Sequence, residues 1–260
     1  MSAMIKFDFE PPVALLTLNR PEKLNALTDS MLDQALKLCR DIERNSAVRG
    51  LIIMGAGDRS FCAGGDIGAW SDLEGSAFAR HWVRDGHSAL DALATLLQPV
   101  VAVLNGDVLG GGLEMAAVAD YRIAESHIRL GQPETLLGII PGWSGTQRTV
   151  RRFGSSVVKR MALFGETFSA EEALQLGIVD RVVEKGQGLN EARSLIDSLS
   201  TRSPVATELT KQLINASEGE ERERVLEALA SYVAANSKGL QIGLSAFRRK
   251  SIADFRDTVD

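Results

Sequence analysis

Two short, uninterrupted apolar runs constrain the fold of this chain more than any other feature. Residues 51–54 (Leu-Ile-Ile-Met) are followed by Gly55, and residues 100–104 (Val-Val-Ala-Val-Leu) are followed by the turn signal Asn105-Gly106. Apolar runs of this length between turn residues are typical of strands that are buried on both faces by covering helices. Strand-like and helix-like stretches alternate from residue 50 onward, so the chain is expected to be an α/β protein.

Start and stop signals place the remaining elements and divide the chain. The last part of the sequence, from about residue 200, contains only helical patterns. We therefore expect a core of residues 1–200 followed by a helical region of residues 201–260. The other expected elements are an opening hairpin at 5–9 and 13–18, a helix capped by Thr28, a helix at 76–97, a short helix opened by the capping box Ser169–Glu172, a helix beginning at Pro204 and a helix at 219–238.

The composition excludes several classes of function. The 260 residues include 29 basic and 34 acidic side chains, and the resulting charge of −5 disfavours a nucleic-acid binder. The two cysteines, Cys39 and Cys62, and the three scattered histidines show no metal-ligand spacing, so no metal is expected. The first residues lack a signal-peptide pattern and no window approaches 18 uninterrupted apolar residues, so we expect a cytoplasmic protein without a membrane span.

Two glycine-rich segments follow the predicted buried strands and are candidate binding loops. Residues 60–67 (Ser-Phe-Cys-Ala-Gly-Gly-Asp-Ile) contain adjacent glycines, which allow the backbone to approach a ligand closely. Residues 105–116 contain three glycines at the entrance to a helix, where unpaired N–H groups suit an anion or a developing oxyanion. The segment has neither the spacing of a dinucleotide fingerprint nor the Lys-Ser/Thr ending of a P-loop.

Two glutamates lie in apolar, glycine-rich surroundings. Glu114 is just inside an apolar helical run, where burial of a charge is costly without a purpose. Glu134 follows Pro133 at a plausible helix start, where a solvated charge is the simplest explanation of an isolated glutamate. Taken together, the two carboxyl groups are what acid–base handling of a water molecule requires.

Five segments form a further pattern, in order along nearly the whole chain: residues 19–27 (Asn-Arg-Pro-Glu-Lys-Leu-Asn-Ala-Leu), 61–67, 105–114, 131–148 and 245–250 (Ser-Ala-Phe-Arg-Arg-Lys). These segments resemble those of the crotonase superfamily, particularly its enoyl-CoA hydratases. The resemblance implies a spiral of ββα units with a C-terminal helical appendage used for trimerisation, giving a homotrimer or a dimer of trimers. It implies reversible syn hydration of a 2-enoyl-CoA to a 3-hydroxyacyl-CoA through an enolate, with coenzyme A as part of the substrate and no other cofactor.

The resemblance also implies roles for individual residues. The amides of Ala63 and Gly111 would form the oxyanion hole for the thioester carbonyl. Glu114 and Glu134 would hold one water, deliver hydroxide to the β-carbon and protonate the α-carbon. Because such a pair titrates as a unit, the protonated member at each stage stays open. The residues implied in coenzyme A binding are Lys23, Leu24, Ala26, Asp66, Ile67, Phe247 and Lys250.

One departure from the family pattern concerns the acyl pocket. Many hydratases carry small residues after the Pro-Gly of this motif, whereas Trp143 and Ser144 follow Gly142 here. The indole of Trp143, together with Trp70, is expected either to shorten the acyl pocket or to provide a stacking wall for a branched, cyclic or aromatic acyl group, unless it faces the core. The same stretch lacks the final glycine of a serine-hydrolase nucleophile turn, and no histidine follows it.

Other functions compatible with this family also stay open. One is isomerisation of a 3-enoyl-CoA to the 2-enoyl form, which needs only one carboxylate. Another is hydrolysis of an acyl-CoA, and a third is non-catalytic binding of an acyl-CoA or RNA. The presence of both glutamates and of the intact glycine triplet favours the hydratase.

Overall fold

A computed structural model describes residues 3–70, 73, 77–220, 238–251, 254 and 256, without the side chains of residues 240, 241, 243, 244, 247 and 248. The chain divides into two units, Met1–Leu209 and Thr210–Asp260. Most of the helix expected at 219–238 lies outside the described residues. No described helix is long and apolar enough to cross a membrane.

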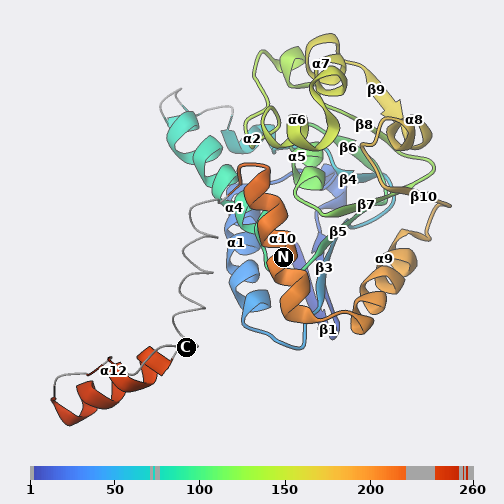
Figure 1. The fold of residues 1–260 in the computed structure, drawn as a ribbon. Helices are drawn as coiled ribbons and strands as arrows, with labels where there is room; N and C mark the ends of the chain where they lie inside the picture. The colour runs from blue at the N-terminus through green and yellow to red at the C-terminus, as the bar shows by residue number, and fades with distance from the viewer. Residues whose placement is uncertain are drawn as a thin grey trace. The chain divides into compact units, whose positions relative to one another are not determined.

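Two sheets organise the first unit (Figure 1). Within them, β1–β2 and β8–β9 are antiparallel, and the other paired strands are parallel. The larger sheet has the order β1 (Ile5–Glu10), β2 (Val13–Leu18), β3 (Gly50–Gly55), β5 (Val100–Leu104), β7 (Tyr121–Glu125) and β10 (Arg181–Val183). The smaller sheet has the order β4 (Ser60–Cys62), β6 (Asp107–Leu109), β8 (Arg129–Gly131) and β9 (Thr167–Ser169).

Helical segments connect and cover these strands. The α-helices are α1 (Asp29–Glu43), α2 (Ile67–Trp70), α4 (Arg84–Ala94), α5 (Gly111–Ala117), α6 (Arg148–Phe153), α7 (Ser155–Phe164), α8 (Ala170–Gln175), α9 (Gly188–Asp197), α10 (Pro204–Ser217) and α12 (Lys238–Arg249). A π-helix, η2 (Phe78–Val83), leads directly into α4. The 3-10 helices are η1 (Pro21–Lys23), η3 (Glu134–Leu137) and η4 (Ser198–Thr201).

The expected elements of the core are confirmed. The two apolar runs become β3 and β5, which are parallel neighbours in the larger sheet. Thr28 caps α1 by accepting a hydrogen bond from the N–H of Met31, and the capping box at Ser169 opens α8. The helix expected at 76–97 is present as η2 followed by α4. The spacing of the apolar residues did not predict that its first part, η2, is a π-helix.

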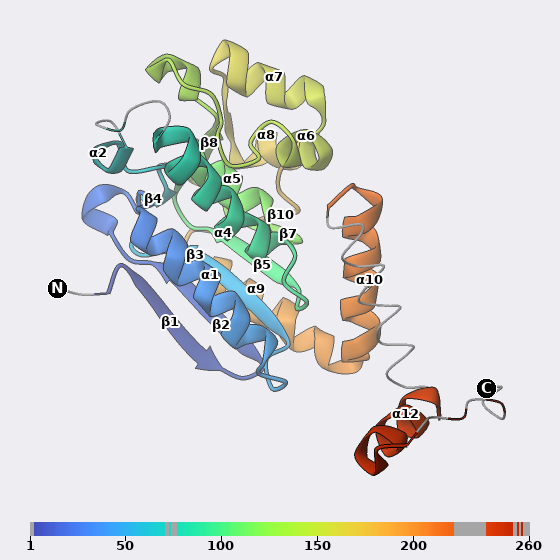
Figure 2. The same cartoon turned by 90° about the vertical axis from the view of Figure 1, so that its left-hand side faces the viewer.

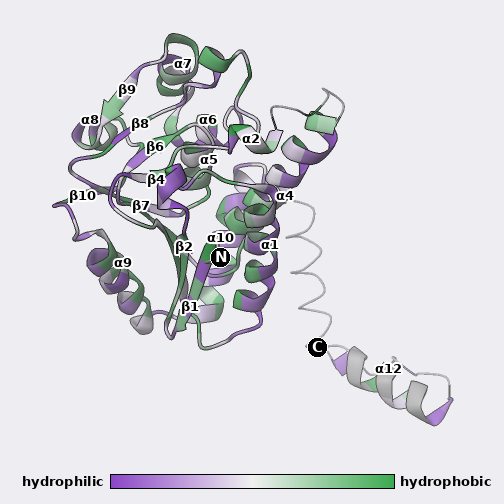
Figure 3. Ribbon diagram, turned by 180° about the vertical axis from the view of Figure 1, so that it is seen from behind, coloured by the Kyte–Doolittle hydropathy of each residue, from purple (hydrophilic) through white to green (hydrophobic). Residues whose placement is uncertain are grey.

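Apolar layers lie on both faces of the larger sheet. Helices α1 and α4 pack beside each other on one face (Figure 2), above a large cluster that includes Leu51 and Ile53. Helix α9 covers the other face, where Ile196 packs with Ile52 and Val103. In Figure 3, α1 and α9 each show one hydrophilic and one hydrophobic side, as helices between a sheet and solvent require. The alternation of Ile52 and Ile53 between the two clusters explains why β3 is apolar throughout.

A repeated unit of two strands and a helical segment brings the loops together. Strands β3, β5 and β7 of the larger sheet are each followed by a strand of the smaller one, namely β4, β6 and β8. Helical segments α2, α5 and η3 follow these second strands. Because β4, β6 and β8 are parallel neighbours, their carboxyl ends lie at one edge of the smaller sheet. The three segments singled out in the sequence begin at this edge.

Candidate active site

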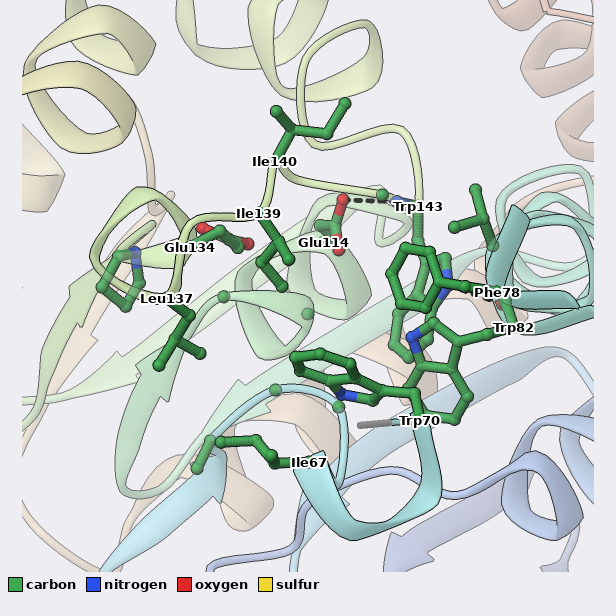
Figure 4. A pocket seen from close by; sticks show the side chains of 18 of the residues that line it. Ile67, Trp70, Phe78, Trp82, Glu114, Glu134, Leu137, Ile139, Ile140 and Trp143 are labelled. Atoms are coloured by element: carbon green, nitrogen blue, oxygen red, sulfur yellow. Dashed lines mark hydrogen bonds between the residues drawn. The ribbon is translucent and has the colours of Figure 1, made fainter. Parts of the chain in front are cut away.

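A cavity of about 270 Å³ lies where the loops after β4, β6 and β8 meet (Figure 4). Both glutamates line it, together with main chain from the glycine-rich loops and a set of large apolar side chains. Its lining residues are Ala63, Gly64, Gly65, Ile67, Trp70, Phe78, Trp82, Val83, Gly110, Gly111, Glu114, Pro133, Glu134, Leu136, Leu137, Ile139, Ile140, Gly142 and Trp143.

Glu114 lies in the first turn of α5 and is only 3% exposed. Its Oε1 accepts hydrogen bonds from the main-chain N–H groups of Trp143 and Gly145, both at 2.7 Å. These bonds fix the carboxyl group and favour its charged form, but burial and the nearby Glu134 outweigh them. The pKa of Glu114 is consequently raised to about 8.

Glu134 is the first residue of η3, and it is buried rather than solvated. Neither of its carboxylate oxygens accepts a hydrogen bond from another described residue. The absence of a Cβ on Gly110 leaves room for this carboxyl group, since a Cβ there would lie 3.3 Å from Oε1. Burial raises the pKa of Glu134 to about 7. Two neighbouring carboxyl groups that both titrate near neutrality are suited to exchange a proton with a bound molecule.

The two raised pKa values predict that the stability of the fold depends on pH. A carboxyl group with a folded pKa near 7 or 8 and an ordinary pKa of 4.5 when unfolded stabilises the protein fully below pH 4.5. That contribution is lost as the pH rises through 7–8. Between pH 5 and pH 8.5, the free energy of unfolding of the wild type should fall by on the order of 2 kcal/mol more than that of Glu114→Gln, measured by urea denaturation. Parallel pH dependences of the two proteins would show that Glu114 titrates normally.

Of the two main-chain amides inferred from the sequence, that of Gly111 is free to bind a ligand and that of Ala63 is not. The N–H of Ala63 donates to the carbonyl of Leu24 at 3.0 Å, so this amide is already used within the protein. The N–H groups of Gly65 and Gly111 donate to no other group among the described residues. A Cβ on Gly111 would lie 3.3 Å from the nitrogen of Gly65, so these two amides are close neighbours at the cavity. The sequence did contain a signal for the amide of Gly65, namely the adjacent glycines at 64 and 65, which allow the backbone to approach a ligand closely.

Two indoles form the buried end of the cavity. Trp143 is 3% exposed, and its Nε1 donates to the carbonyl of Trp82 at 3.1 Å. The two rings pack with centroids 5.0 Å apart and planes tilted by 48°. Trp70 packs edge-on against Phe78 with ring centroids 5.6 Å apart, and both side chains line the cavity beside Trp82 (Figure 4). Trp143 is therefore both a core aromatic and a wall of the cavity, whereas Trp82 was not singled out from the sequence.

The loop that holds Glu114 is itself supported from α4. Ser144 adopts a left-handed backbone conformation with φ of 70°, which is uncommon for a residue other than glycine. Its hydroxyl oxygen lies 3.1 Å from Nδ1 of His87, and neither residue lines the cavity. One turn further along α4, Asp91 forms a 2.7 Å ion pair with the buried Arg148. The Ser144–His87 contact therefore supports the loop and is not placed to attack a bound thioester.

Substitutions at Ser144 should separate backbone strain from hydrogen bonding. Ser144→Ala retains the left-handed conformation and loses the contact with His87, so it is expected to lower the free energy of unfolding by about 1 kcal/mol. Ser144→Gly also loses the contact but relieves the strain, and should be about 0.5–1 kcal/mol more stable than Ser144→Ala. Chemical denaturation of both variants measures the difference. Equal stabilities would mean that residue 144 carries no backbone strain.

The residues implied in coenzyme A binding are only partly described. Asp66 forms a 2.8 Å ion pair with Arg20, whose guanidinium also donates to the carbonyl of Ala26. Burial opposes ionisation of Asp66, but the hydrogen bonds from Arg20 and Gly68 prevail and lower its pKa. Lys23, Leu24 and Ile67 are exposed, and of these Ile67 lines the cavity. Lys250 is exposed in the second unit, and the side chain of Phe247 lies outside the described residues.

The described residues contain no group of three His, Cys, Asp or Glu side chains placed to hold a metal ion. Of the described residues that line the cavity, only Glu114 and Glu134 have ionisable side chains, and the glycine-rich loops contribute main-chain amides. This set handles protons and binds a developing negative charge on oxygen.

Comparisons with known proteins agree on one family. A family model described as "Enoyl-CoA hydratase/isomerase" matches residues 8–258. The chain is 40% identical to a short-chain-enoyl-CoA hydratase of Clostridium acetobutylicum over 79% of this chain and 78% of the relative. It is 34% identical to a crotonyl-CoA hydratase of Syntrophomonas wolfei over 95% of each chain. Its structure resembles an enoyl-CoA hydratase from Bacillus anthracis with a TM-score of 0.80 and 31% identity, covering 97% of this chain and 98% of the other.

Proposed function

Because this chain belongs to the enoyl-CoA hydratase/isomerase family, we propose that Glu114 and Glu134 add water across the double bond of a 2-enoyl-CoA bound in the cavity. The reaction is reversible and yields a 3-hydroxyacyl-CoA. The observation that carries this proposal is the pair of buried carboxyl groups with raised pKa values beside one cavity. An isomerase needs one carboxyl group and a binding protein needs none, so neither accounts for the second buried glutamate.

The amides of Gly65 and Gly111 receive the thioester oxygen in this proposal. Both N–H groups lack partners among the described residues, and both residues line the cavity next to the glutamates. Gly65 therefore replaces Ala63 as the second donor. When hydroxide adds to the β-carbon, negative charge moves to the thioester oxygen, and two fixed N–H donors stabilise it without reorganising.

The proton balance of the reaction requires one proton on the pair. One carboxylate removes a proton from water while the hydroxide forms its bond to the β-carbon. The other carboxyl group donates its proton to the α-carbon and becomes a carboxylate. The pair holds one proton before and after hydration, and the roles exchange in the reverse direction. Raised pKa values near 7 and 8 keep such a shared proton available at neutral pH.

We propose that the coenzyme A part of the substrate lies outside the cavity, along the exposed segments beside it. Coenzyme A is bound by the residues that the family pattern implies, namely Lys23, Leu24, Ala26, Asp66, Ile67, Phe247 and Lys250. Hydration moves no electrons to or from the protein, so we propose no cofactor besides the coenzyme A of the substrate. We also propose that the protein is cytoplasmic and forms a homotrimer or a dimer of trimers through residues 201–260. Light scattering measures the mass of the assembly in solution.

Hydration of crotonyl-CoA in oxygen-18 water tests the proposed function. The loss of ultraviolet absorbance follows the double bond, and mass spectrometry locates the label. A hydratase places oxygen-18 on the β-carbon of 3-hydroxybutyryl-CoA. An unlabelled product with a shifted double bond would identify an isomerase, and release of free coenzyme A would identify a hydrolase.

A further inference from the structure

We propose that Trp143 and Trp82 close the acyl end of the cavity and restrict this enzyme to short-chain 2-enoyl-CoA substrates. The inference rests on the proposed hydratase function and names the acyl group that its site accepts. Trp143 is the residue that determines the limit.

The exposure of the lining residues shows which end of the cavity is closed. Leu136 and Ile140 are 81% and 75% exposed, and they mark the side that is open to solvent. Trp82 and Trp143 are 5% and 3% exposed and lie across the cavity from Glu134 and Leu137 (Figure 4). Coenzyme A is far too large for a cavity of about 270 Å³, so it must leave through the open side. The acyl group of the same substrate then extends from the thioester toward the two indoles.

The indole of Trp143 is fixed and does not give way to a longer chain. Its Nε1–H bond to Trp82 holds one edge of the ring, and Gly86 of α4 touches it so closely that a Cβ there would overlap the indole. On the other side, a Cβ on Gly111 would lie 2.9 Å from Cζ3 of the ring. The indole is thus packed between α4 and the residue that supplies an oxyanion-hole amide. Each additional methylene of a substrate would have to displace this packed ring.

The same packing disfavours an aromatic acyl group. A phenyl ring stacks well when it lies flat against an indole or between two parallel walls. Trp82 and Trp143 are instead tilted by 48° and already in contact with each other, and Gly65 packs against the ring of Trp82. The closed end therefore offers no slot between the indoles.

The test compares enoyl-CoA substrates of different acyl length on variants of Trp143. The substrates are crotonyl-CoA, 2-hexenoyl-CoA, 2-octenoyl-CoA and cinnamoyl-CoA, and the readout is the ratio of kcat/KM for the eight-carbon to the four-carbon substrate. In the wild type this ratio should be well below one. In Trp143→Ala it should rise at least about tenfold, because the opened space buries the added methylenes. The main-chain N–H that holds Glu114 is retained in this variant.

Two controls keep the result interpretable. Trp143→Phe opens less space than Trp143→Ala and should raise the ratio of kcat/KM values less. It serves as the test variant if Trp143→Ala does not fold. Phe168→Ala removes a buried aromatic of β9 that does not line the cavity, so it should leave the ratio unchanged. Calorimetry with butyryl-CoA and octanoyl-CoA provides a binding readout that does not depend on turnover.

The possible outcomes separate this inference from the function on which it rests. If the wild type hydrates 2-octenoyl-CoA or cinnamoyl-CoA as well as crotonyl-CoA, the short-chain limit is wrong although the hydratase proposal stands. An unchanged ratio in both Trp143 variants would also overturn the inference. If no enoyl-CoA is hydrated, the hydratase proposal fails. The two binding affinities then still decide whether the indoles exclude the longer chain.

Discussion

Glu114→Gln and Glu134→Gln are each expected to lower kcat for crotonyl-CoA hydration by about 10²–10⁴-fold. Glutamine keeps the volume of the side chain and, at residue 114, an oxygen that accepts the two main-chain hydrogen bonds. It neither gains nor loses a proton under the reaction conditions. Because hydration requires one carboxyl group to take a proton and the other to give one, loss of either interrupts the transfer. Steady-state kinetics at several pH values measure the effect.

Glu125→Gln is the matched control for these variants. Glu125 lies at the end of β7, is only 4% exposed and does not line the cavity. The Glu125→Gln variant loses a buried carboxyl group at a position outside the cavity. Its kcat should therefore change by less than about threefold. Full activity in Glu114→Gln or in Glu134→Gln would show that hydration does not need two carboxyl groups.

Gly111→Pro is expected to lower kcat by about 10²–10³-fold relative to Gly111→Ala, because proline removes one oxyanion donor. Gly111 is the first residue of α5, a position at which a helix accepts proline. A Cβ at this residue meets the ring of Trp143 at 2.9 Å in both variants. Both variants therefore place the same Cβ beside the indole. Only the proline lacks the N–H, because a ring methylene takes the place of that hydrogen.

The comparison of the two Gly111 variants is made on folded protein. Their thermal unfolding temperatures should be similar, and the two variants should differ more in kcat than in KM for crotonyl-CoA. This pattern is that of a group that binds the transition state more strongly than the substrate. Equal kcat values for Gly111→Pro and Gly111→Ala would remove this amide from the oxyanion hole.

The layers of the fold were predictable from the sequence because their signals are local. The apolar runs of β3 and β5 are bounded by turn residues, and Thr28 precedes a regular helical pattern. The pairing of β4 with β6 and β8 was not predictable in the same way. These strands have three residues each, too few for periodicity to identify, and their partners are distant in the sequence.

The site was predictable in its residue types and less so in its atoms. Glu114 and Glu134 were identified from their glycine-rich, apolar surroundings, and both are buried at one cavity. The proposed oxyanion donor is Gly65 and not Ala63, because the N–H of Ala63 donates to the carbonyl of Leu24. That hydrogen bond is a tertiary contact. The position of the Trp143 indole likewise depends on Gly86, a helix residue 57 positions earlier whose missing Cβ makes the space. Sequence patterns do not specify such long-range packing.

The most direct test of the whole account is a crystal structure of the enzyme with a bound acyl-CoA thioester. We expect the thioester oxygen to lie within hydrogen-bond distance of the nitrogens of both Gly65 and Gly111. The carboxyl groups of Glu114 and Glu134 should face the α- and β-carbons, and the acyl group should end against the indole of Trp143. A thioester oxygen bound away from both amides, or an acyl group with only one carboxyl group beside it, would contradict the account.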